Sequence, residues 1–187
     1  MNIFVVDYDA ATAARMLCDS HVVKMILESC QLLSTAHHVL DGDPLEVNTS
    51  KRRYVTHVCT KKNICKAAMI NHPCNIWTRT TSENYLWLWK HAYALCKEYT
   101  RRYGKVHSME SMLLNELYDC PVNLPKGKLT TFVQAMPEQY KNENAVVAYR
   151  SYYINEKAAF AKWKATEVPD WFAEKIADVF SDVLVPF

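Results

Sequence analysis

The sequence predicts a mostly α-helical fold made of one compact domain. The chain has 187 residues, of which 50% are hydrophobic, so it can bury one sizeable core but is short for two. It contains only 3 glycines, while 5 Trp, 11 Tyr and 6 Phe residues supply bulky core side chains, which excludes a disordered or linker-rich chain. Apolar residues recur at helical spacing in several long stretches. We therefore predict a single domain over residues 1–187.

The first part of the chain is expected to hold an extended segment, a long helical region and a loop. The apolar run 2–6 suits a short buried extended segment. Residues 10–41 follow a helical period, which fits one long helix or two consecutive ones, with Asp9 or Asp19 able to cap a helix. Residues 45–69 are polar, basic and of mixed period, so we expect a loop with a short helix near its end.

The second part of the chain alternates helices with one long irregular stretch. A helix begins at Ser82 with an acidic residue in its first turn, and Gly104 closes it. A proline-containing surface loop is expected between the helices that follow. These further helices are predicted at 108–118, 145–163 and 171–183, and the loop at 120–140.

Neither a membrane segment nor a metal centre is expected. No apolar run reaches the roughly 20 residues that a membrane-spanning helix needs, and the first apolar residues run directly into acidic ones instead of a signal-peptide core. We therefore expect a soluble, cytoplasmic protein. The 7 cysteines are odd in number and lack paired C-x-x-C spacing, which predicts reduced thiols. Glycine-rich nucleotide-binding motifs are also missing, so we predict no cofactor. His37, His38 and His57 do not combine with Cys or carboxylates at metal-ligand spacing, so we predict no metal.

Basic residues form clusters, although the net charge of +2 is too small to indicate a nucleic-acid-binding protein by itself. A run of charge is usually only a solvated face, so the clusters carry little weight alone. They are Lys51, Arg52, Arg53, Lys61, Lys62 and Lys66; Arg101, Arg102 and Lys105; and Lys126 and Lys128.

The densest polar constellation lies in the first helical region. His21, Lys24, Glu28 and Gln31 recur at spacings that place them on one stripe of a helix. Lys24 and Glu28 could form an ordinary exposed ion pair. Apolar residues flank the stripe on both sides, however, and a carboxylate held in such a place can serve as a general base. We therefore take Glu28, His21 and Lys24 as candidate catalytic residues.

A second polar group surrounds His72. Asn71 and His72 precede a proline, and Arg79 follows a short aromatic segment. His72 could simply cap the next helix. Alternatively it points into the same cleft as Glu28, where His, Asn and Arg side chains can hold a phosphate or a base edge.

Cations are interleaved with aromatic residues in a third group. Arg150, Tyr153 and Lys157 lie within one predicted helix. Aromatic and cationic side chains in such a pattern suit stacking on an unpaired base. The same aromatic residues could equally belong to the core.

With these residues laid out, the chain resembles the pyrimidine-dimer DNA glycosylases, the family of endonuclease V of the T-even phages. That family has a helix with a His and, seven residues later, the catalytic Glu, which fall here on His21 and Glu28. The region of His72 resembles the family's His-containing turn before a long helix. Residues 137–141 resemble a family segment of the pattern Pro-Glu-x-aromatic-basic, and residues 156–157 resemble a later Glu-Lys pair. The resemblance implies an endonuclease V-like helical fold that binds double-stranded DNA and takes one nucleotide out of the duplex.

The chain departs from this family at its start. The family's nucleophile is the α-amine of a small residue exposed by removal of Met, whereas Asn2, which is too large for efficient Met removal, follows Met1 here. Segments 2–7 and 18–28 also resemble a group of small phage proteins, some of which are associated with thymine hypermodification. That chemistry needs no N-terminal nucleophile.

This second resemblance implies a DNA base-modifying transferase. A free amino acid or amine would be joined to activated 5-hydroxymethyluracil in DNA, with Glu28 deprotonating the amine and Lys24 or Arg79 balancing the leaving phosphate. We expect this activity, in the cytoplasm of an infected bacterium. One alternative is a pyrimidine-specific DNA glycosylase with the same site. Another is a non-catalytic DNA-binding or host-inhibitory protein that uses only the basic clusters. The sequence does not predict the oligomeric state.

Overall fold

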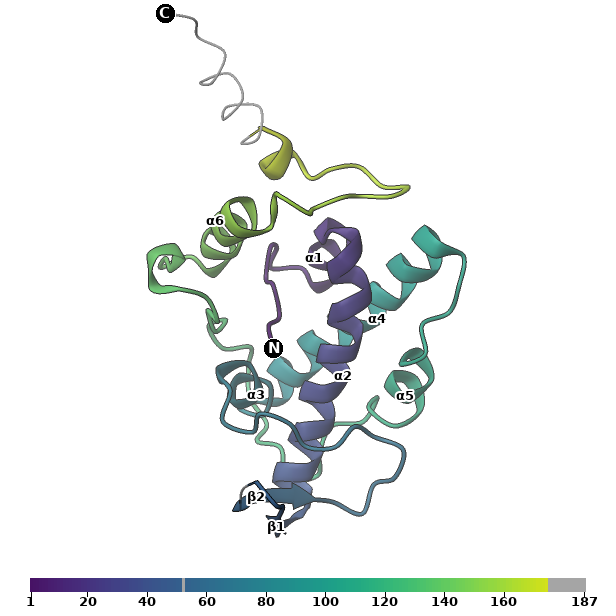
Figure 1. Ribbon diagram of the computed structural model, residues 1–187, viewed down its shortest axis with the longest axis vertical. Helices are drawn as coiled ribbons and strands as arrows, with labels where there is room; N and C mark the ends of the chain where they lie inside the picture. Colours follow the sequence, from purple (N-terminus) through teal and green to yellow (C-terminus); the bar gives the residue numbers. More distant parts are fainter. Residues whose placement is uncertain (52, 175–187) are drawn as a thin grey trace, which may run out of the picture.

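Two long helices form the centre of the protein. The computed structural model describes residues 1–51 and 53–174. In it α2 (Asp19–Asp41) packs along α4 (Ser82–Tyr103), and α1 (Ala10–Met16) also packs on α4 (Figure 1). Both long helices present a row of buried apolar side chains to this interface. The prediction of a mostly α-helical fold is confirmed.

The first helical region is two helices rather than one. Asp9 caps α1 by accepting a hydrogen bond from the backbone N–H of Thr12. The backbone is extended at Leu17 and Cys18, and α2 then begins at Asp19. The buried guanidinium of Arg102 donates to the carbonyl oxygen of Leu17, at the break. A tertiary contact therefore satisfies backbone groups that a continuous helix would have used internally.

The region 45–69 contains a β-hairpin where we expected a loop. Strands β1 (Asp43–Asn48) and β2 (Arg53–Val58) pair antiparallel, with Asp43 opposite Val58 and Asn48 opposite Arg53. Most residues on both faces of the hairpin are exposed, so the sequence lacks the alternation of a half-buried strand. The expectation of a short helix near the end of this region is also wrong. Helix α3 (Pro73–Thr78) starts later, after the histidine that caps it.

The later helices lie close to their predicted positions. Helix α4 ends at Gly104, which adopts a left-handed conformation with φ of 66°. It is followed by α5 (Glu110–Asn115), the 3-10 helix η1 (Glu138–Tyr140) and α6 (Ala145–Lys157). Helix α6 therefore ends before residue 163. Most of the helix predicted at 171–183 lies outside the described residues.

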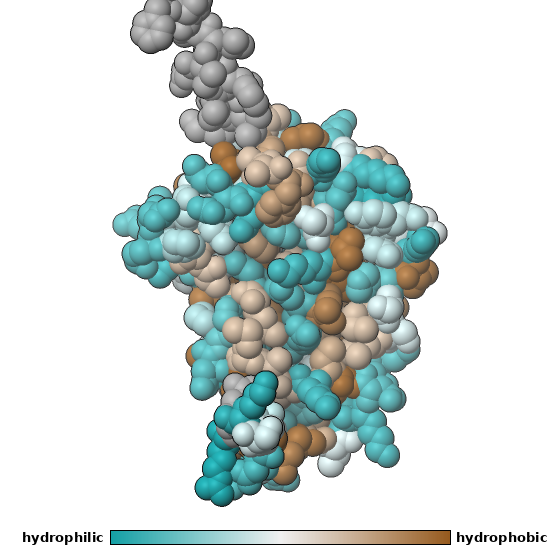
Figure 2. Space-filling view, viewed as in Figure 1, coloured by the Kyte–Doolittle hydropathy of each residue, from teal (hydrophilic) through white to brown (hydrophobic). Residues whose placement is uncertain are grey.

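The first residues of the chain run through the middle of the fold. Ile3, Val5 and Val6 are fully buried, and in Figure 1 the N-terminus lies close to α3 and α2. The segment is buried as predicted, but it is not a regular extended strand: Phe4 has a positive φ of 41°, and the backbone N–H of Val6 donates to the carbonyl oxygen of Phe4. It pairs with no strand among the described residues. Figure 2 shows hydrophilic residues over much of this face, including the lower end, where the hairpin lies. None of the described helices is long and apolar enough to cross a membrane.

Candidate functional site

Glu28 lies where α2 meets the beginning of the chain. Its Oε2 accepts a hydrogen bond from the backbone N–H of Asn2, at 3.0 Å, and its Oε1 lies 3.5 Å from Nζ of Lys24. The Glu28 side chain is only 14% exposed, whereas that of Lys24 is 66% exposed. The predicted i,i+4 ion pair therefore forms, but its carboxylate also faces inward and touches the chain's first peptide group.

The side chain of Asn2 fixes the backbone that faces Glu28. Its Nδ2 donates to the carbonyl oxygen of Ala135, at 2.8 Å, and its Oδ1 accepts from the backbone N–H groups of Ile3 and Phe4. Asn2 is buried, and each of these contacts is internal to the protein. Asn2 therefore anchors the N-terminal segment between α2 and the 120–137 loop.

His72 is close to the same carboxylate. Its Nδ1 accepts a hydrogen bond from the backbone N–H of Cys74, so it caps α3 as one of our two interpretations proposed. Burial lowers the pKa of His72, the positive charge of the chain's α-amino group lowers it further, and Glu28 opposes the shift. Glu28 and the α-amino group are thus within electrostatic reach of His72, which also caps α3.

Cys74, whose place the sequence left open, lies next to this cluster. Its side chain is fully buried, and burial raises the pKa of the thiol to about 12, although the chain's α-amino group opposes the shift. The group is therefore a neutral thiol at neutral pH and not a thiolate nucleophile. Only its position in the sequence, two residues after His72, could have suggested it.

His21 is held in one defined position. Its Nδ1 lies 2.8 Å from the hydroxyl of Tyr153, and that hydroxyl accepts a hydrogen bond from the backbone N–H of Cys18. The His21 ring and the Tyr153 hydroxyl therefore share one hydrogen bond, whose donor depends on which ring nitrogen carries the proton. The ring stacks on Phe4. Burial lowers the pKa of His21 to about 4, with further lowering by Lys157 and Lys24.

Three buried histidines are expected to make the fold sensitive to mild acid. The folded-state pKa values of His21, His37 and His91 are lowered to about 4, 4 and 3, mainly by burial. The unfolded chain therefore binds more protons below pH 6.5, and the stabilising contribution is lost as pH falls from 6.5 toward 4. Each histidine should contribute on the order of 1–2 kcal/mol to the difference between pH 7 and pH 5. Urea unfolding at the two pH values measures this difference.

A His91→Phe variant is the matched test of that prediction. His91 is fully buried and neither ring nitrogen has a hydrogen-bond partner among the described residues. The variant should lose part of the pH dependence without losing a hydrogen bond that the structure records. An unchanged dependence between pH 7 and pH 5 would show that His91 does not contribute.

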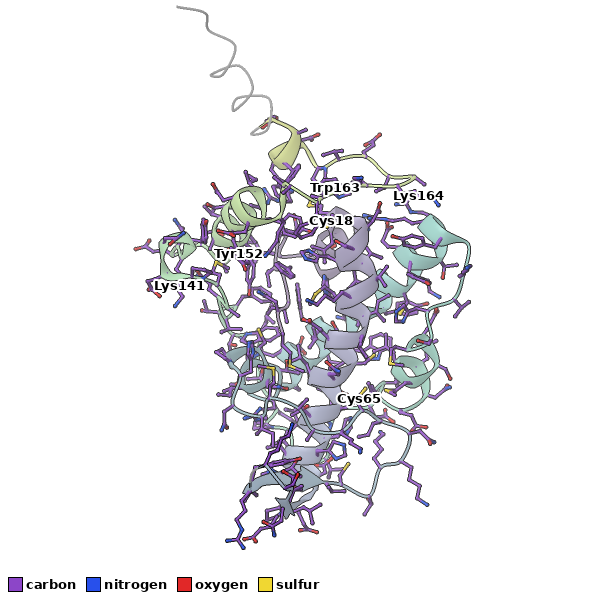
Figure 3. The ribbon with its side chains drawn as sticks, viewed as in Figure 1. Cys18, Cys65, Lys141, Tyr152, Trp163 and Lys164 are labelled. Carbon is purple, nitrogen blue, oxygen red and sulfur yellow. The ribbon has the colours of Figure 1, made fainter. Side chains whose placement is uncertain are left out.

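Two lysines place positive charge beside His21. Lys157 donates from Nζ to the hydroxyl of Tyr152 and lies over its ring, 4.6 Å from the centroid. Figure 3 labels Tyr152 on α6, and its ring stacks with that of Phe4 in the N-terminal segment. Together with Lys24, Lys157 provides a cationic border to the buried cluster, which suits the phosphates of a nucleic acid.

Tyr153 is a core residue and not a surface for stacking. Its side chain is fully buried, and its hydroxyl is used by Cys18 and His21. The structure therefore brings it to the site as support for His21. The aromatic side chain of this helix that is partly exposed near the site is Tyr152.

The remaining residues near α3 differ in their exposure. Asn71 is exposed, just before His72. Arg79 ends α3, and its Nη1 is buried without a hydrogen-bond partner among residues 1–51 and 53–174. An unpaired buried donor on a guanidinium is available to an anionic group that binds beside it.

Three further arginines from the predicted site are held away from Glu28 by other partners. Arg102 has a fully buried side chain that is bonded to Glu98 and Asp19, and Arg101 pairs with the same Glu98. Arg150 donates to the carbonyl oxygen of Val6 and so holds the N-terminal segment. Internal contacts therefore occupy these three guanidinium groups.

The basic hairpin is also separate from Glu28. Lys51 is exposed, and Arg53 donates from Nε to the side chain of Asn48. Arg52 lies outside the described residues. In Figure 1 the hairpin is at the opposite end of α2 from α1 and α6. Contact with DNA through Lys51 and Arg53 stays a prediction.

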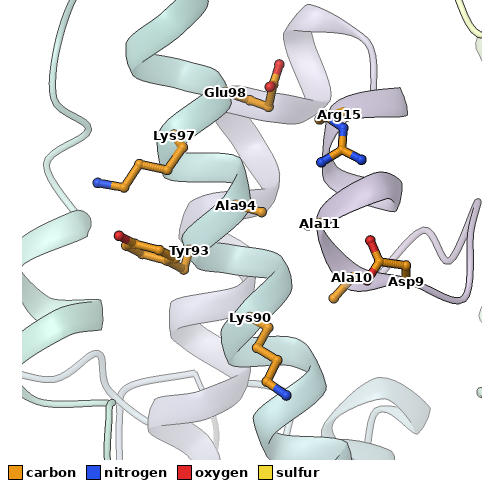
Figure 4. Close-up of a pocket in the computed structure, with 9 residues that line it drawn as sticks. All are labelled: Asp9, Ala10, Ala11, Arg15, Lys90, Tyr93, Ala94, Lys97 and Glu98. Carbon is orange, nitrogen blue, oxygen red and sulfur yellow. The ribbon is translucent and has the colours of Figure 1, made fainter.

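A surface hollow lies elsewhere, between α1 and α4. It encloses about 420 Å³ and is lined by Asp9, Ala10, Ala11, Arg15, Lys90, Tyr93, Ala94, Lys97 and Glu98 (Figure 4). Lys97 and Glu98 are already engaged in ion pairs. None of our candidate catalytic residues reaches this hollow. In the described part of the chain no group of three or more His, Cys, Asp or Glu side chains is arranged to hold a metal ion.

Comparison with known proteins identifies a family. A family model described as pyrimidine dimer DNA glycosylase matches residues 1–111. The matched segment contains Glu28, His21, Lys24 and His72. No curated protein and no solved structure is detectably similar to the chain.

Proposed function

Because the chain belongs to the pyrimidine dimer DNA glycosylase family, we propose that it excises a pyrimidine base from DNA at the cluster around Glu28. The observation that carries the proposal is the 3.0 Å hydrogen bond between Glu28 Oε2 and the backbone N–H of Asn2. It places a mostly buried carboxylate beside the start of the chain, with the neutral His72 nearby.

Glu28 has two roles in this reaction: it stabilises positive charge and it accepts a proton. When the bond between the base and C1′ breaks, the base leaves with the electron pair and positive charge develops on the sugar. A carboxylate beside C1′ stabilises that charge and can take a proton from the attacking water. His21 is neutral and held by Tyr153, so it does not act as a cation in this step. The products are a free base and an abasic site.

Lys24 and Lys157 are the residues that we assign to the DNA backbone at this site. Lys24 is largely exposed, and both lysines lie close enough to His21 to lower its pKa. Their positive charge would hold phosphates on either side of an extruded nucleotide. Lys51 and Arg53 on the hairpin would add a more distant contact, so their removal should weaken DNA binding without changing which bond is broken.

The lysine assignment predicts a change in salt dependence. Lys24→Ala and Lys157→Ala should each reduce the slope of log affinity against log salt concentration by about 1, because each removes one phosphate contact. Fluorescence anisotropy with a short duplex at several salt concentrations measures the slope. Lys105→Ala, which changes an exposed lysine beyond α4, is the matched control and should leave the slope unchanged. Equal slopes in all four proteins would remove Lys24 and Lys157 from the DNA interface.

The excision proposal is tested by analysing DNA after incubation with the protein. Substrates should contain thymine, 5-hydroxymethyluracil or a pyrimidine dimer, and mass spectrometry should follow free bases and nucleosides. Release of a base with formation of abasic sites is the expected result. Reduction with borohydride during the reaction then distinguishes attack by water from attack by the α-amine, because only the amine gives a trapped DNA–protein adduct. Unchanged DNA in every case would overturn the proposal.

Asn2 favours a second candidate, the transfer of an amino acid or amine to activated 5-hydroxymethyluracil in DNA. With Met1 in place the nitrogen beside Glu28 is an amide, which is not a nucleophile, so Glu28 would act on an external amine. A heavier nucleoside formed only when amino acids are present would favour the transferase. Normal function of a Glu28→Gln variant would instead favour a non-catalytic DNA-binding protein.

A further inference from the structure

The side-chain amide of Asn75 is buried, and its oxygen is unused. Asn75 lies on α3 and is 1% exposed. Its Nδ2 donates to the carbonyl oxygens of Ala68 and Met69, at 2.8 Å each, which uses both of its hydrogens. Its Oδ1 is buried and has no hydrogen-bond partner among the residues that the structure describes. Because the two carbonyls require the nitrogen at their end of the amide, the unused end is an acceptor.

This amide lies beside the first residue of the chain, next to the cluster around Glu28. Asn75 follows Cys74, whose thiol responds to the charges of Glu28 and of the chain's α-amino group. Nδ2 of Asn75 also lies 3.5 Å from the sulfur of Met1. Since no hydrogen of Nδ2 remains for that sulfur, Met1 makes a packing contact there. A flat ring can replace such a contact without the loss of a hydrogen bond.

We propose that Oδ1 of Asn75 accepts a hydrogen bond from the N–H edge of the target pyrimidine, and so helps to select the base. An unpaired buried acceptor destabilises the free protein, and a bound N–H group removes that penalty. Thymine and uracil offer the ring N3–H, and cytosine offers its exocyclic amine. A base whose donor is methylated is rejected because the acceptor stays unpaired. The proposal rests on the function proposed above.

The test compares binding of matched duplexes by Glu28→Gln protein, so that no turnover interferes. The target base is thymine, N3-methylthymine or cytosine, placed opposite an abasic position so that methylation does not alter base pairing. We expect N3 methylation to weaken binding about 10- to 100-fold. Introducing Asn75→Ala into the Glu28→Gln protein should reduce the difference in affinity between thymine and N3-methylthymine to less than about threefold, because the acceptor for the N3–H group is gone.

Two further variants test whether the effect of Asn75→Ala comes from the loss of Oδ1 or from any change to a buried polar side chain. Asn75→Ser keeps a hydroxyl that can donate to one of the two carbonyls but places no oxygen at the position of Oδ1, and it should behave like Asn75→Ala. Glu110→Gln changes another buried oxygen without a partner in the described chain, on α5, and should keep the full discrimination. Circular dichroism confirms that each variant is folded.

The outcomes separate this inference from the proposed function. Strong binding of cytosine as well as thymine would show that Oδ1 also accepts a hydrogen bond from the exocyclic amine of cytosine. Equal discrimination against N3-methylthymine with and without Asn75, or none in the Glu28→Gln protein, would overturn the inference. Failure of the wild-type protein to release a base would instead overturn excision alone, since the binding comparison does not depend on turnover.

Discussion

Replacing Glu28 by Gln is expected to reduce base release about 10²- to 10⁴-fold, the range lost when a general acid or base is removed. Gln keeps the size of the side chain and can still accept a hydrogen bond from the N–H of Asn2, but it cannot take a proton or stabilise positive charge on the sugar. DNA affinity should be equal to or greater than that of the wild type, because a negative charge near the phosphates is lost. Single-turnover kinetics and anisotropy measure the two effects separately.

A Glu46→Gln variant is the control for this prediction. Glu46 is an exposed carboxylate on β1, in the hairpin at the far end of α2. Its replacement removes the same charge from the protein but should leave the rate of base release unchanged. Wild-type activity of the Glu28→Gln protein would remove Glu28 from the reaction.

Adding Gly-Ser before Met1 is expected to lower turnover about 100-fold, since small displacements of reacting groups have effects of that size. The α-amino group lies near His72 and Cys74, and Asn2 is buried with its backbone on Glu28. Added residues must either displace this segment or occupy the space of the substrate. Initial rates at saturating DNA, with intact mass confirming the N-terminus, measure the effect.

The same Gly-Ser addition after Phe187 is the control and should leave the rate unchanged. Thermal unfolding of both proteins shows whether the N-terminal addition also destabilises the fold. Unchanged turnover with Gly-Ser before Met1 would show that the start of the chain is not part of the reaction site, and would favour a site that uses Glu28 from its other side.

Local sequence patterns predicted the helices well and the hairpin poorly. Helix α4 is set by its apolar period, its first-turn acid and Gly104, all of which act within one or two turns. The pair β1 and β2 is exposed on both faces, so no alternation of apolar residues marks it. The break at Leu17 and Cys18 depends on Arg102, more than eighty residues away, and could not be read from local spacing.

The sequence by itself determined the helical class of the fold and the pairing of Lys24 with Glu28, because both follow from the helical repeat. It also carried the resemblance to the glycosylase family, which the family match over residues 1–111 confirmed. Tertiary structure alone decided that the backbone of Asn2 contacts Glu28, that His72 lies within electrostatic reach of Glu28, and that Arg102 and Tyr153 are internal. These placements depend on which side chains the core buries, and burial is a property of the whole fold rather than of any stretch of the chain.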